Sequence, residues 1–426
     1  MSTFEAFQYR DYRLLWVGNL CTTIAVWIQT TTMSWVAYTL TGSGRTIGIV
    51  NAMRMVPTLF MTPVSGVAVD RFSRNKIIAV SQLSMFMFTL LLAIDIFLGK
   101  LQVWHLFLFA LLGGITNTFN LPARQTFVFD IVPAHVLPNA IALDNIAFSS
   151  ARTLAASGAG ALIVAFGAGN NFLIQACMYL AIMATVLSIK ARRPPRTSPR
   201  RHFFREMVEG YSYASRNPNA RLLLLMMIIN PMLLIPLHLA LLPMFAKTVF
   251  VGGAAALGLL LGSLGVGGFF GGLLTASLSK VDRRGLVQLI SLLIHSLAHA
   301  GFCVFAYWTG RIWFALPFLV LAGTMESIHM TTNQTVLQLL APDHLRGRLT
   351  SVLQLAQLIN PVGIFAAGAL GDLFGPVVVG VAFSMCGFFM TAAIFMFSSR
   401  MRDLRLSELQ SLGQQGLDPL PPVDIA

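Results

Sequence analysis

Long uncharged apolar runs, separated by short charged segments, dominate the chain and predict twelve membrane-spanning helices. A helix needs about 20 mostly apolar residues to cross the hydrocarbon core of a bilayer, and each run reaches that length. The first run is too long for the apolar core of a signal peptide, so we expect no cleaved targeting segment. The predicted spans are 14–39, 45–69, 77–98, 102–127, 139–166, 170–190, 222–249, 253–278, 286–309, 312–338, 349–373 and 376–398.

One stretch of the chain recurs in the same direction 209 residues later. The residues identical in both copies are Gly114, Gln125, Thr126, Pro133, His135 and Ala147, which match Gly323, Gln334, Thr335, Pro342, His344 and Ala356 without a gap. Parallel repeats of membrane helices are typical of carriers built from two halves with a binding site between them. The fold class we expect is therefore an all-α integral membrane protein with twelve transmembrane helices in two parallel-repeat six-helix bundles.

The repeat and the hydropathy pattern together predict four regions. The N-terminal six-helix bundle covers residues 1–190, and the C-terminal bundle covers residues 222–400. A basic cytosolic linker, 191–221, joins them, and apolar residues at helical spacing from Phe203 predict a short amphipathic helix on the inner leaflet. The polar tail, 401–426, is expected to be disordered.

Composition and charge placement support the membrane class. Hydrophobic residues make up 56% of the chain, charged residues only 11%, and the mean hydropathy is +0.74, which excludes an ordinary soluble protein. The net charge of +13 would suit nucleic acid, but 22 of the 29 Lys and Arg lie on one set of loops and tails. This bias places both termini in the cytosol and directs the basic residues toward lipid head groups. We expect the lipid bilayer as a partner, and no nucleic acid.

The loop between spans two and three carries a compact charged motif, made of Gly66, Asp70, Arg71, Arg74 and Lys76. It resembles the signature loop of the major facilitator superfamily. A small residue allows close contact between helices, and an acid at this place can cap a neighbouring helix and pair with the arginines, forming a gating latch. The alternative is a cytosolic turn that is charged only for topology.

Four further stretches resemble the enterobactin-exporter and macrolide-efflux branch of this superfamily, and the resemblance covers about residues 7–400. They are Asp11–Trp16, Asn120–Gln125, Pro138–Ala140 and Pro342–Arg348. The resemblance implies an export carrier of the bacterial inner membrane, driven by a proton or other ion gradient and without a cofactor. Ala155 and Ala156 stand where such exporters often carry Gly-Pro, which leaves strict proton antiport as one of the open alternatives.

Two equivalent helices carry matched polar stripes. Asn117, Asn120 and Arg124 share one face of span four, and the repeat offset maps them onto Glu326, His329 and Asn333 of span ten. The family resemblance implies that spans one, four, seven and ten line the central cavity, which adds Gln29 and Asn230. We expect these eight residues to bind the solute, although hydrogen bonds between helices within each bundle would also explain them.

Buried charges supply the candidates for coupling. A charged acid at mid-span costs roughly 2.5–3.5 kcal/mol, so Glu326 is the expected proton carrier, with Asp144 and Arg152 as coupling partners. Arg54 of span two is expected to serve as an interdomain charge or gate. Asp372 lies near an outer span end, where we expect it to be solvated.

No enzyme motif is present in the sequence. It has no phosphate-binding Gly-Lys-Ser/Thr loop, no nucleophile elbow and no paired Cys or His motif, so we expect neither an enzyme nor a metal site. His295 and His299 share one face of span nine and are expected to make a structural hydrogen bond. The leading hypothesis is a monomeric, proton-coupled exporter of a bulky polar or amphipathic small molecule, such as a siderophore or a drug. The alternatives are a facilitator or importer of a small metabolite, and a non-transporting membrane scaffold or sensor.

Overall fold

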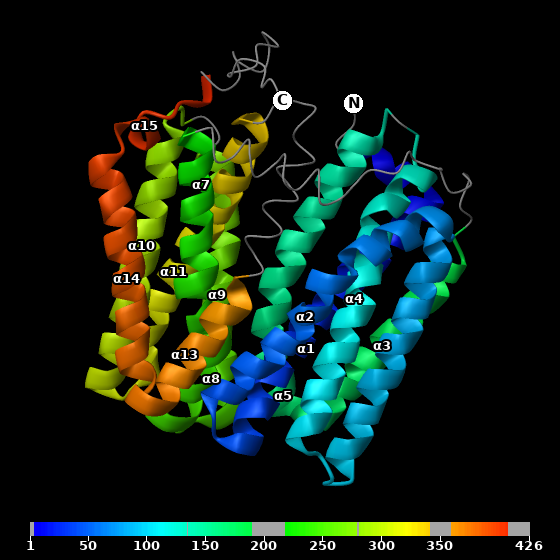
Figure 1. Cartoon of the computed structure of the whole chain (residues 1–426), viewed down its shortest axis with the longest axis horizontal. Coiled ribbons are helices and arrows are strands. Elements are labelled where there is room, and N and C mark those ends of the chain that lie inside the picture. The colour runs from blue at the N-terminus through cyan, green and yellow to red at the C-terminus, as the bar shows by residue number, and fades with distance from the viewer. Residues whose placement is uncertain (1–3, 134, 190–217, 279–280, 341–358, 408–426) are drawn as a thin grey trace, which may run out of the picture. The chain divides into compact units, whose positions relative to one another are not determined.

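The computed structural model describes residues 4–133, 135–189, 218–278, 281–340 and 359–407, and every regular element among them is a helix (Figure 1). Nine of the helices in these ranges are long and apolar enough to cross a membrane. Linker residues 191–217, which include the predicted amphipathic helix, and the first part of predicted span eleven lie outside the described residues. The prediction of an all-helical membrane protein is confirmed.

The N-terminal helices follow the predicted spans closely. A short helix, η1 (Glu5–Gln8), precedes α1 (Arg10–Thr41), α2 (Gly44–Arg71), α3 (Arg74–Phe97), α4 (Val103–Ile131) and α5 (Leu137–Leu187). The last of these contains predicted spans five and six. They meet at Gly167, whose φ of 78° and ψ of 166° break the helix. The break lies in the three-residue gap left between the two predicted spans.

The C-terminal helices contain an unusual span seven. It begins as α7 (Pro218–Ile229) and continues through three π-helical segments and a short helical turn, namely η2 (Asn230–Leu234), η3 (Leu237–Leu241), α8 (Leu242–Met244) and η4 (Phe245–Val249). Wide π turns are rare in proteins and frequently occur at functional sites. The remaining elements are α9 (Gly253–Ser277), α10 (Arg284–Thr309), α11 (Ile312–Leu340), α13 (Asn360–Phe374), α14 (Pro376–Phe397) and α15 (Ser399–Arg402).

By their internal contacts the residues form two compact units. The first unit comprises Met1–Arg200, Leu239–Gly265 and Ile364–Leu373, and the second comprises Arg201–His238, Val266–Gly363 and Phe374–Ala426. Each unit is described by itself below.

Glycines bring equivalent helix pairs into backbone contact in the two copies of the repeat. In the first unit, a Cβ on Gly114 of α4 would lie 2.2 Å from the Arg54 carbonyl oxygen of α2. In the second unit, a Cβ on Gly267 of α9 would lie 2.0 Å from the Val320 carbonyl oxygen of α11. No side chain fits in either place, so spans two and four, and likewise eight and ten, pack backbone against backbone.

The chain remains ordered beyond the last span. Met401 and Leu404 are buried, and the backbone N–H groups of Leu406 and Ser407 donate to the carbonyl and carboxylate oxygens of Asp282 at 2.8 and 2.9 Å. The bond from the Ser407 backbone is the main cause that lowers the pKa of the exposed Asp282 carboxyl. The expectation of a disordered tail from residue 401 is therefore wrong for residues 401–407, because apolar side chains anchor them.

Asp372 caps the N-terminus of α2. Its carboxylate accepts hydrogen bonds from the Ser43 hydroxyl at 2.5 Å and from the backbone N–H groups of Gly44 and Arg45 at 2.6 and 3.1 Å. All four residues belong to the first unit. A negative charge at this end of a helix is stabilised by the helix dipole and by the free N–H groups. Asp372 is therefore a capping residue, and its side chain is exposed, as expected for a solvated span end.

We predict that Asp372→Ala destabilises the protein by about 1 kcal/mol, the usual effect of losing a helix cap. The midpoint of thermal unfolding of the detergent-purified protein measures the loss. The midpoint of Asp372→Asn, which keeps one acceptor oxygen, should lie between those of the parent protein and Asp372→Ala. Asp403→Ala, at an exposed position, serves as the control. An unchanged midpoint in Asp372→Ala would show that the cap does not contribute to stability.

Candidate functional site

A small pocket, mostly apolar with a few polar groups, lies inside the first unit, between α1, α2 and α4. Its lining residues are Gln29, Thr30, Met33, Val50, Asn51, Arg54 and Ala110. Two residues from the sequence-based list, Gln29 and Arg54, thus meet at one place, although they were assigned different roles. Small-molecule sites commonly combine apolar walls with a few converging polar groups. This pocket has that composition, but in this structure it has room for about one water molecule.

The polar side chains of this pocket are held by neighbours. The Arg54 guanidinium donates to the Thr30 hydroxyl, and the Gln29 amide oxygen accepts from the Tyr179 hydroxyl at 2.9 Å. Gln29 and Asn51 are only 6% and 5% exposed. Because the Arg54 backbone packs directly on Gly114, the position of the guanidinium is set by the α2–α4 contact. A guanidinium has five N–H donors and suits recognition of an anion or a carbonyl group.

A second polar cluster of the first unit joins α1, α4 and α5. The Arg124 guanidinium donates to the Asn19 side chain at 2.8 Å and to the Asn19 carbonyl at 3.0 Å. The Asp144 carboxylate lies where it attracts Arg124, and it accepts a long hydrogen bond of 3.4 Å from the Tyr12 hydroxyl. Arg124 and Asp144 were predicted for separate roles, and the structure brings them together. The side chain of Arg152 lies outside the described residues.

The other two members of the span-four stripe differ in their surroundings. Asn117 is exposed, whereas Asn120 is 5% exposed and buried within the unit. One side chain of the stripe is thus available at the surface and one is enclosed by helices. The polar stripe of span four is therefore partly exposed and partly buried.

The span-ten stripe lies in the second unit and is mostly enclosed by protein. His329 is fully buried, and the buried Asn333 donates to the Leu223 carbonyl of α7 at 3.4 Å. Glu326 retains 16% exposure of its side chain, and Asn230 is fully buried in η2. The contact made by Asn333 matches the alternative of hydrogen bonding between helices. Glu326 is the member of the stripe best placed to exchange protons.

Glu326 has a neighbour that sequence reasoning missed. Its Oε2 lies 3.9 Å from Nδ1 of His238, which belongs to the π-helical segment η3. The Nε2 atom of His238 lies 3.0 Å from Nε2 of His299, and His295 completes the group. The His295 and His299 pair is visible in the sequence as a four-residue spacing, but the third histidine comes from another span, and no local pattern reveals it.

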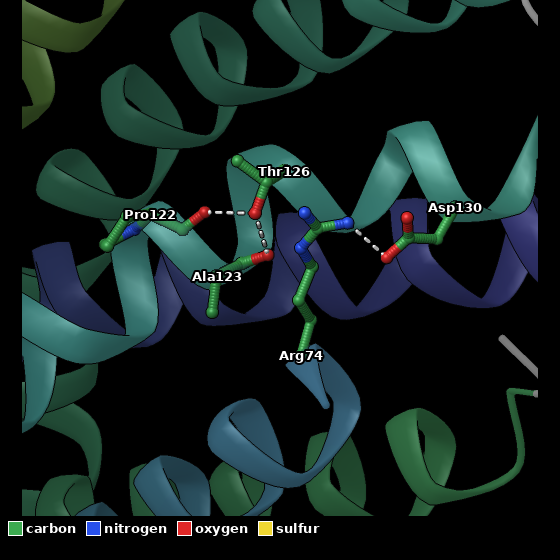
Figure 2. Close-up of polar contacts among 5 residues, drawn as sticks. All are labelled: Arg74, Pro122, Ala123, Thr126 and Asp130. Carbon is green, nitrogen blue, oxygen red and sulfur yellow. Dashed lines mark hydrogen bonds and ion pairs between the residues drawn. The ribbon is translucent and has the colours of Figure 1, made fainter. Parts of the chain in front are cut away.

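The gating loop makes its main ionic contact with a residue that was not predicted. Arg74, at the start of α3, pairs with Asp130 near the end of α4, and both side chains are 13% exposed (Figure 2). On the same helix, the Thr126 hydroxyl contacts the Pro122 and Ala123 carbonyls at 2.7 and 3.2 Å. The loop arginine thus ties α3 to α4.

The other loop residues do not make comparable contacts among the described residues. Arg71 and Lys76 are exposed, and the side chain of Asp70 is not described. A Cβ on Gly66 would meet no described atom within 4 Å. The close helix contact expected at this glycine is therefore absent from the described part of the chain.

Comparison with known proteins identifies the family. A family model of the major facilitator superfamily, described as transmembrane secretion effector, matches residues 1–425. The chain belongs to this family. The resemblance found in the loop between spans two and three, and in the four stretches along the chain, is confirmed.

Transporters and efflux proteins with assigned activities are similar to the chain over most of its length. It is 22% identical to the staphyloferrin A transporter of Staphylococcus aureus, over 93% of this chain and 96% of the relative. It is 25% identical to the enterobactin exporter of Citrobacter koseri, over 87% and 85%, and 22% identical to macrolide efflux protein A of Streptococcus pyogenes, over 86% and 92%. The protein is a multi-pass membrane transporter related to siderophore and drug exporters, and it is not an enzyme.

Solved structures show the same fold. The nucleoside transporter NupG matches with a TM-score of 0.72 at 12% identity, covering 92% of this chain and all (100%) of that one. A D-xylose–proton symporter matches with a TM-score of 0.69 at 13% identity, covering 92% and 98%. The predicted major facilitator fold is confirmed by these likenesses.

For this transporter we predict that Arg74 and Asp130 are energetically coupled. Either Arg74→Ala or Asp130→Ala leaves a largely buried charge without its partner, which should cost about 3 kcal/mol of stability. The double variant removes both charges and should cost less than the sum of the single losses. Thermal unfolding of the four proteins forms the cycle, with the exposed Arg71→Ala as control. Strictly additive losses would contradict the coupling.

Proposed function

We propose that this transporter is a proton-coupled exporter of a bulky, polar or amphipathic small molecule, such as a siderophore or a drug. The observation that carries the proposal is the match of the secretion family to residues 1–425, together with relatives named as exporters of enterobactin and of macrolides. In this proposal the solute site is exposed to one side of the membrane at a time, by alternating access of the two halves.

The pocket beside Arg54 supports a polar solute with oxygen acceptors. Arg54, Gln29 and Asn51 offer a guanidinium and two amides next to apolar walls. Amides and a guanidinium suit carbonyl, hydroxyl and carboxylate groups better than they suit a purely cationic drug. We also assign to the solute site the remaining residues of the polar stripes and their neighbours, namely Asn117, Asn120, Arg124, Asn230, Glu326, His329 and Asn333.

Glu326 supports coupling to protons. Its carboxylate lies within a membrane span, is mostly buried and has His238 as a neighbour. Keeping a carboxylate there is costly, and protonation would relieve that cost. Protonation then drives transport only if the two states of the carrier differ in proton affinity. The Arg124–Asp144 cluster offers a second titratable site in the first unit, and Arg152 belongs to the same proposed coupling group.

The placement in the membrane is also part of the proposal. We assign the protein to the bacterial inner membrane as a monomer with both termini in the cytosol, since the basic residues favour that orientation. The loop of Gly66, Asp70, Arg71, Arg74 and Lys76 then faces the cytosol, where the Arg74–Asp130 pair acts as a latch between α3 and α4.

Two other functions make different predictions. A gradient-driven facilitator or importer would move its solute without regard to an imposed pH difference. A non-transporting scaffold or sensor would move no solute at all. The relatives named as exporters and the buried carboxylate of Glu326 favour coupled export over both.

The coupling prediction is tested in inverted membrane vesicles that are incubated with a labelled siderophore or macrolide. Uptake should rise with an interior-acid pH gradient and fall when an ionophore collapses the gradient. In Glu326→Gln the response to the gradient should be lost, because a neutral side chain cannot exchange a proton. Glu5→Gln, which changes an acid outside the spans, is the control. Uptake that is indifferent both to the gradient and to Glu326→Gln would refute proton-coupled export.

The solute-site prediction concerns Arg54. Arg54→Gln should raise the KM for an anionic or carbonyl-rich solute about tenfold, since a lost hydrogen bond to a charged group costs about 1.5 kcal/mol or more. The matched control is Arg45→Gln, which removes an exposed arginine from the same helix. Equal KM values in the two variants and the parent protein would exclude Arg54 from the solute site.

A further inference from the structure

We propose that the second unit contains a binding site for a divalent transition-metal ion of the zinc class, with His238, His295 and His299 as ligands and Glu326 behind the first of them. The site goes beyond the proposed transport function, and the sequence had predicted no metal site.

The three imidazoles are already gathered to within reach of one ion. One ring nitrogen from each lies within 4.8 Å of the others, and the two Nε2 atoms of His238 and His299 are 3.0 Å apart. Nitrogen ligands of a tetrahedral zinc ion, each about 2.0–2.1 Å from the metal, lie roughly 3.3 Å from one another. The distance between the two Nε2 atoms of His238 and His299 is therefore already close to that between two ligands of one ion. The ring centroids of His295 and His299 are 4.5 Å apart, so side-chain adjustment suffices for the third ligand.

A structural hydrogen bond does not account for the whole cluster. It uses one nitrogen each of His238 and His299, and leaves the other nitrogen of His299 and both nitrogens of His295 without a hydrogen-bond partner among the described residues. His295 and His299 are fully buried (0% exposed). Leaving a buried polar group unsatisfied costs about 1–3 kcal/mol, so three such atoms in one place need a reason. An ion that accepts the lone pairs of the imidazoles supplies one.

Glu326 lies where an outer partner of a metal-binding histidine would lie, at a distance that must shorten by about 1 Å for a hydrogen bond to form. A ligating imidazole commonly donates its second N–H to a carboxylate, which fixes the tautomer and makes the ligand more basic. The Glu326 carboxylate lies 3.9 Å from Nδ1 of His238, on the side of the ring opposite to His299. A proton on Nδ1 leaves the Nε2 lone pair of His238 directed toward the other two histidines.

The backbone and the exposure of the residues fit an ion that enters from one side. His238 lies in the π-helical segment η3, where a widened turn displaces the side chain from an ordinary helical position. The side chains of His238 and Glu326 are 12% and 16% exposed, whereas His295 and His299 lie deeper. An ion would meet His238 first and then be enclosed by the two histidines of α10.

The donor set selects the class of ion. Neutral imidazoles bind zinc, nickel, cobalt and copper, whereas magnesium and calcium require oxygen ligands. Three histidines leave a fourth coordination position for water or for an oxygen atom of a bound molecule, as in open zinc sites.

The test uses the full chain, purified in detergent with a streptavidin-binding tag in place of polyhistidine and stripped of metal by a chelator. Titration with Co²⁺ should produce the visible absorption of a tetrahedral cobalt site, saturating at one ion per chain and displaced by Zn²⁺. His295→Ala and His299→Ala should abolish the spectrum. Glu326→Gln should weaken binding by about 10-fold or more, as loss of an outer carboxylate does. The exposed His135→Ala is the control.

Two arrangements keep the result decisive. His295→Asn and His299→Asn retain a polar side chain of smaller size, so a correctly folded variant is available if the alanine variants do not fold, as judged by size-exclusion chromatography. Absence of the cobalt spectrum in the parent protein, or a spectrum that persists in folded His295 and His299 variants, would overturn the metal site. Proton coupling is measured separately, in vesicles. If the parent protein binds no cobalt but Glu326→Gln still loses its response to the pH gradient, the metal site is refuted and the transport proposal stands.

Discussion

The cost of placing polar side chains in hydrocarbon is the constraint on which this structure depends. A bilayer offers no hydrogen bonds, so every polar group in a span has to be satisfied inside the protein or face water. Several of the described polar residues of the spans gather accordingly. Arg54 reaches the Thr30 hydroxyl, and Arg124 reaches Asn19. Glu326 lies beside His238. Where side chains of such cost are kept together in the membrane, a role in binding or coupling is the simplest explanation.

Backbone contacts between helices determine where these polar groups are held. Gly114 lets α4 lie directly on the Arg54 carbonyl of α2, and Gly267 lets α9 lie directly on α11 near Val320. The two contacts join spans two and four in one copy of the repeat, and spans eight and ten in the other. The repeat found in the sequence is thus also a repeat of packing. It places Arg54 beside the pocket of the first unit, and it holds the helix that carries Glu326 in the second.

The sequence predicted the helices well because hydropathy acts along the chain. Predicted span 45–69 became Gly44–Arg71, and the gap between spans five and six contains the break at Gly167. Partners were much harder to predict, because they come from other helices. Asp130 of α4 pairs with Arg74 of α3, 56 residues earlier in the chain. His238 contacts His299 of α10 from a π-helical segment that has no recognisable sequence pattern. Residues 401–407 were misjudged for a related reason, since two buried apolar side chains in a polar tail anchor the segment.

The two units share a packing scheme but carry different chemistry, and this difference bears on how a coupled carrier works. In the first unit the pocket groups are a guanidinium and amides, which remain in one charge state through the cycle. In the second unit the buried groups are a carboxylate and imidazoles, which change charge with proton or metal binding. A carrier that recognises its solute with groups of constant charge offers the solute the same charges and hydrogen-bond donors at every pH. In the proposed exporter, protonation of Glu326 would bias the two states while the groups of this pocket keep their charge.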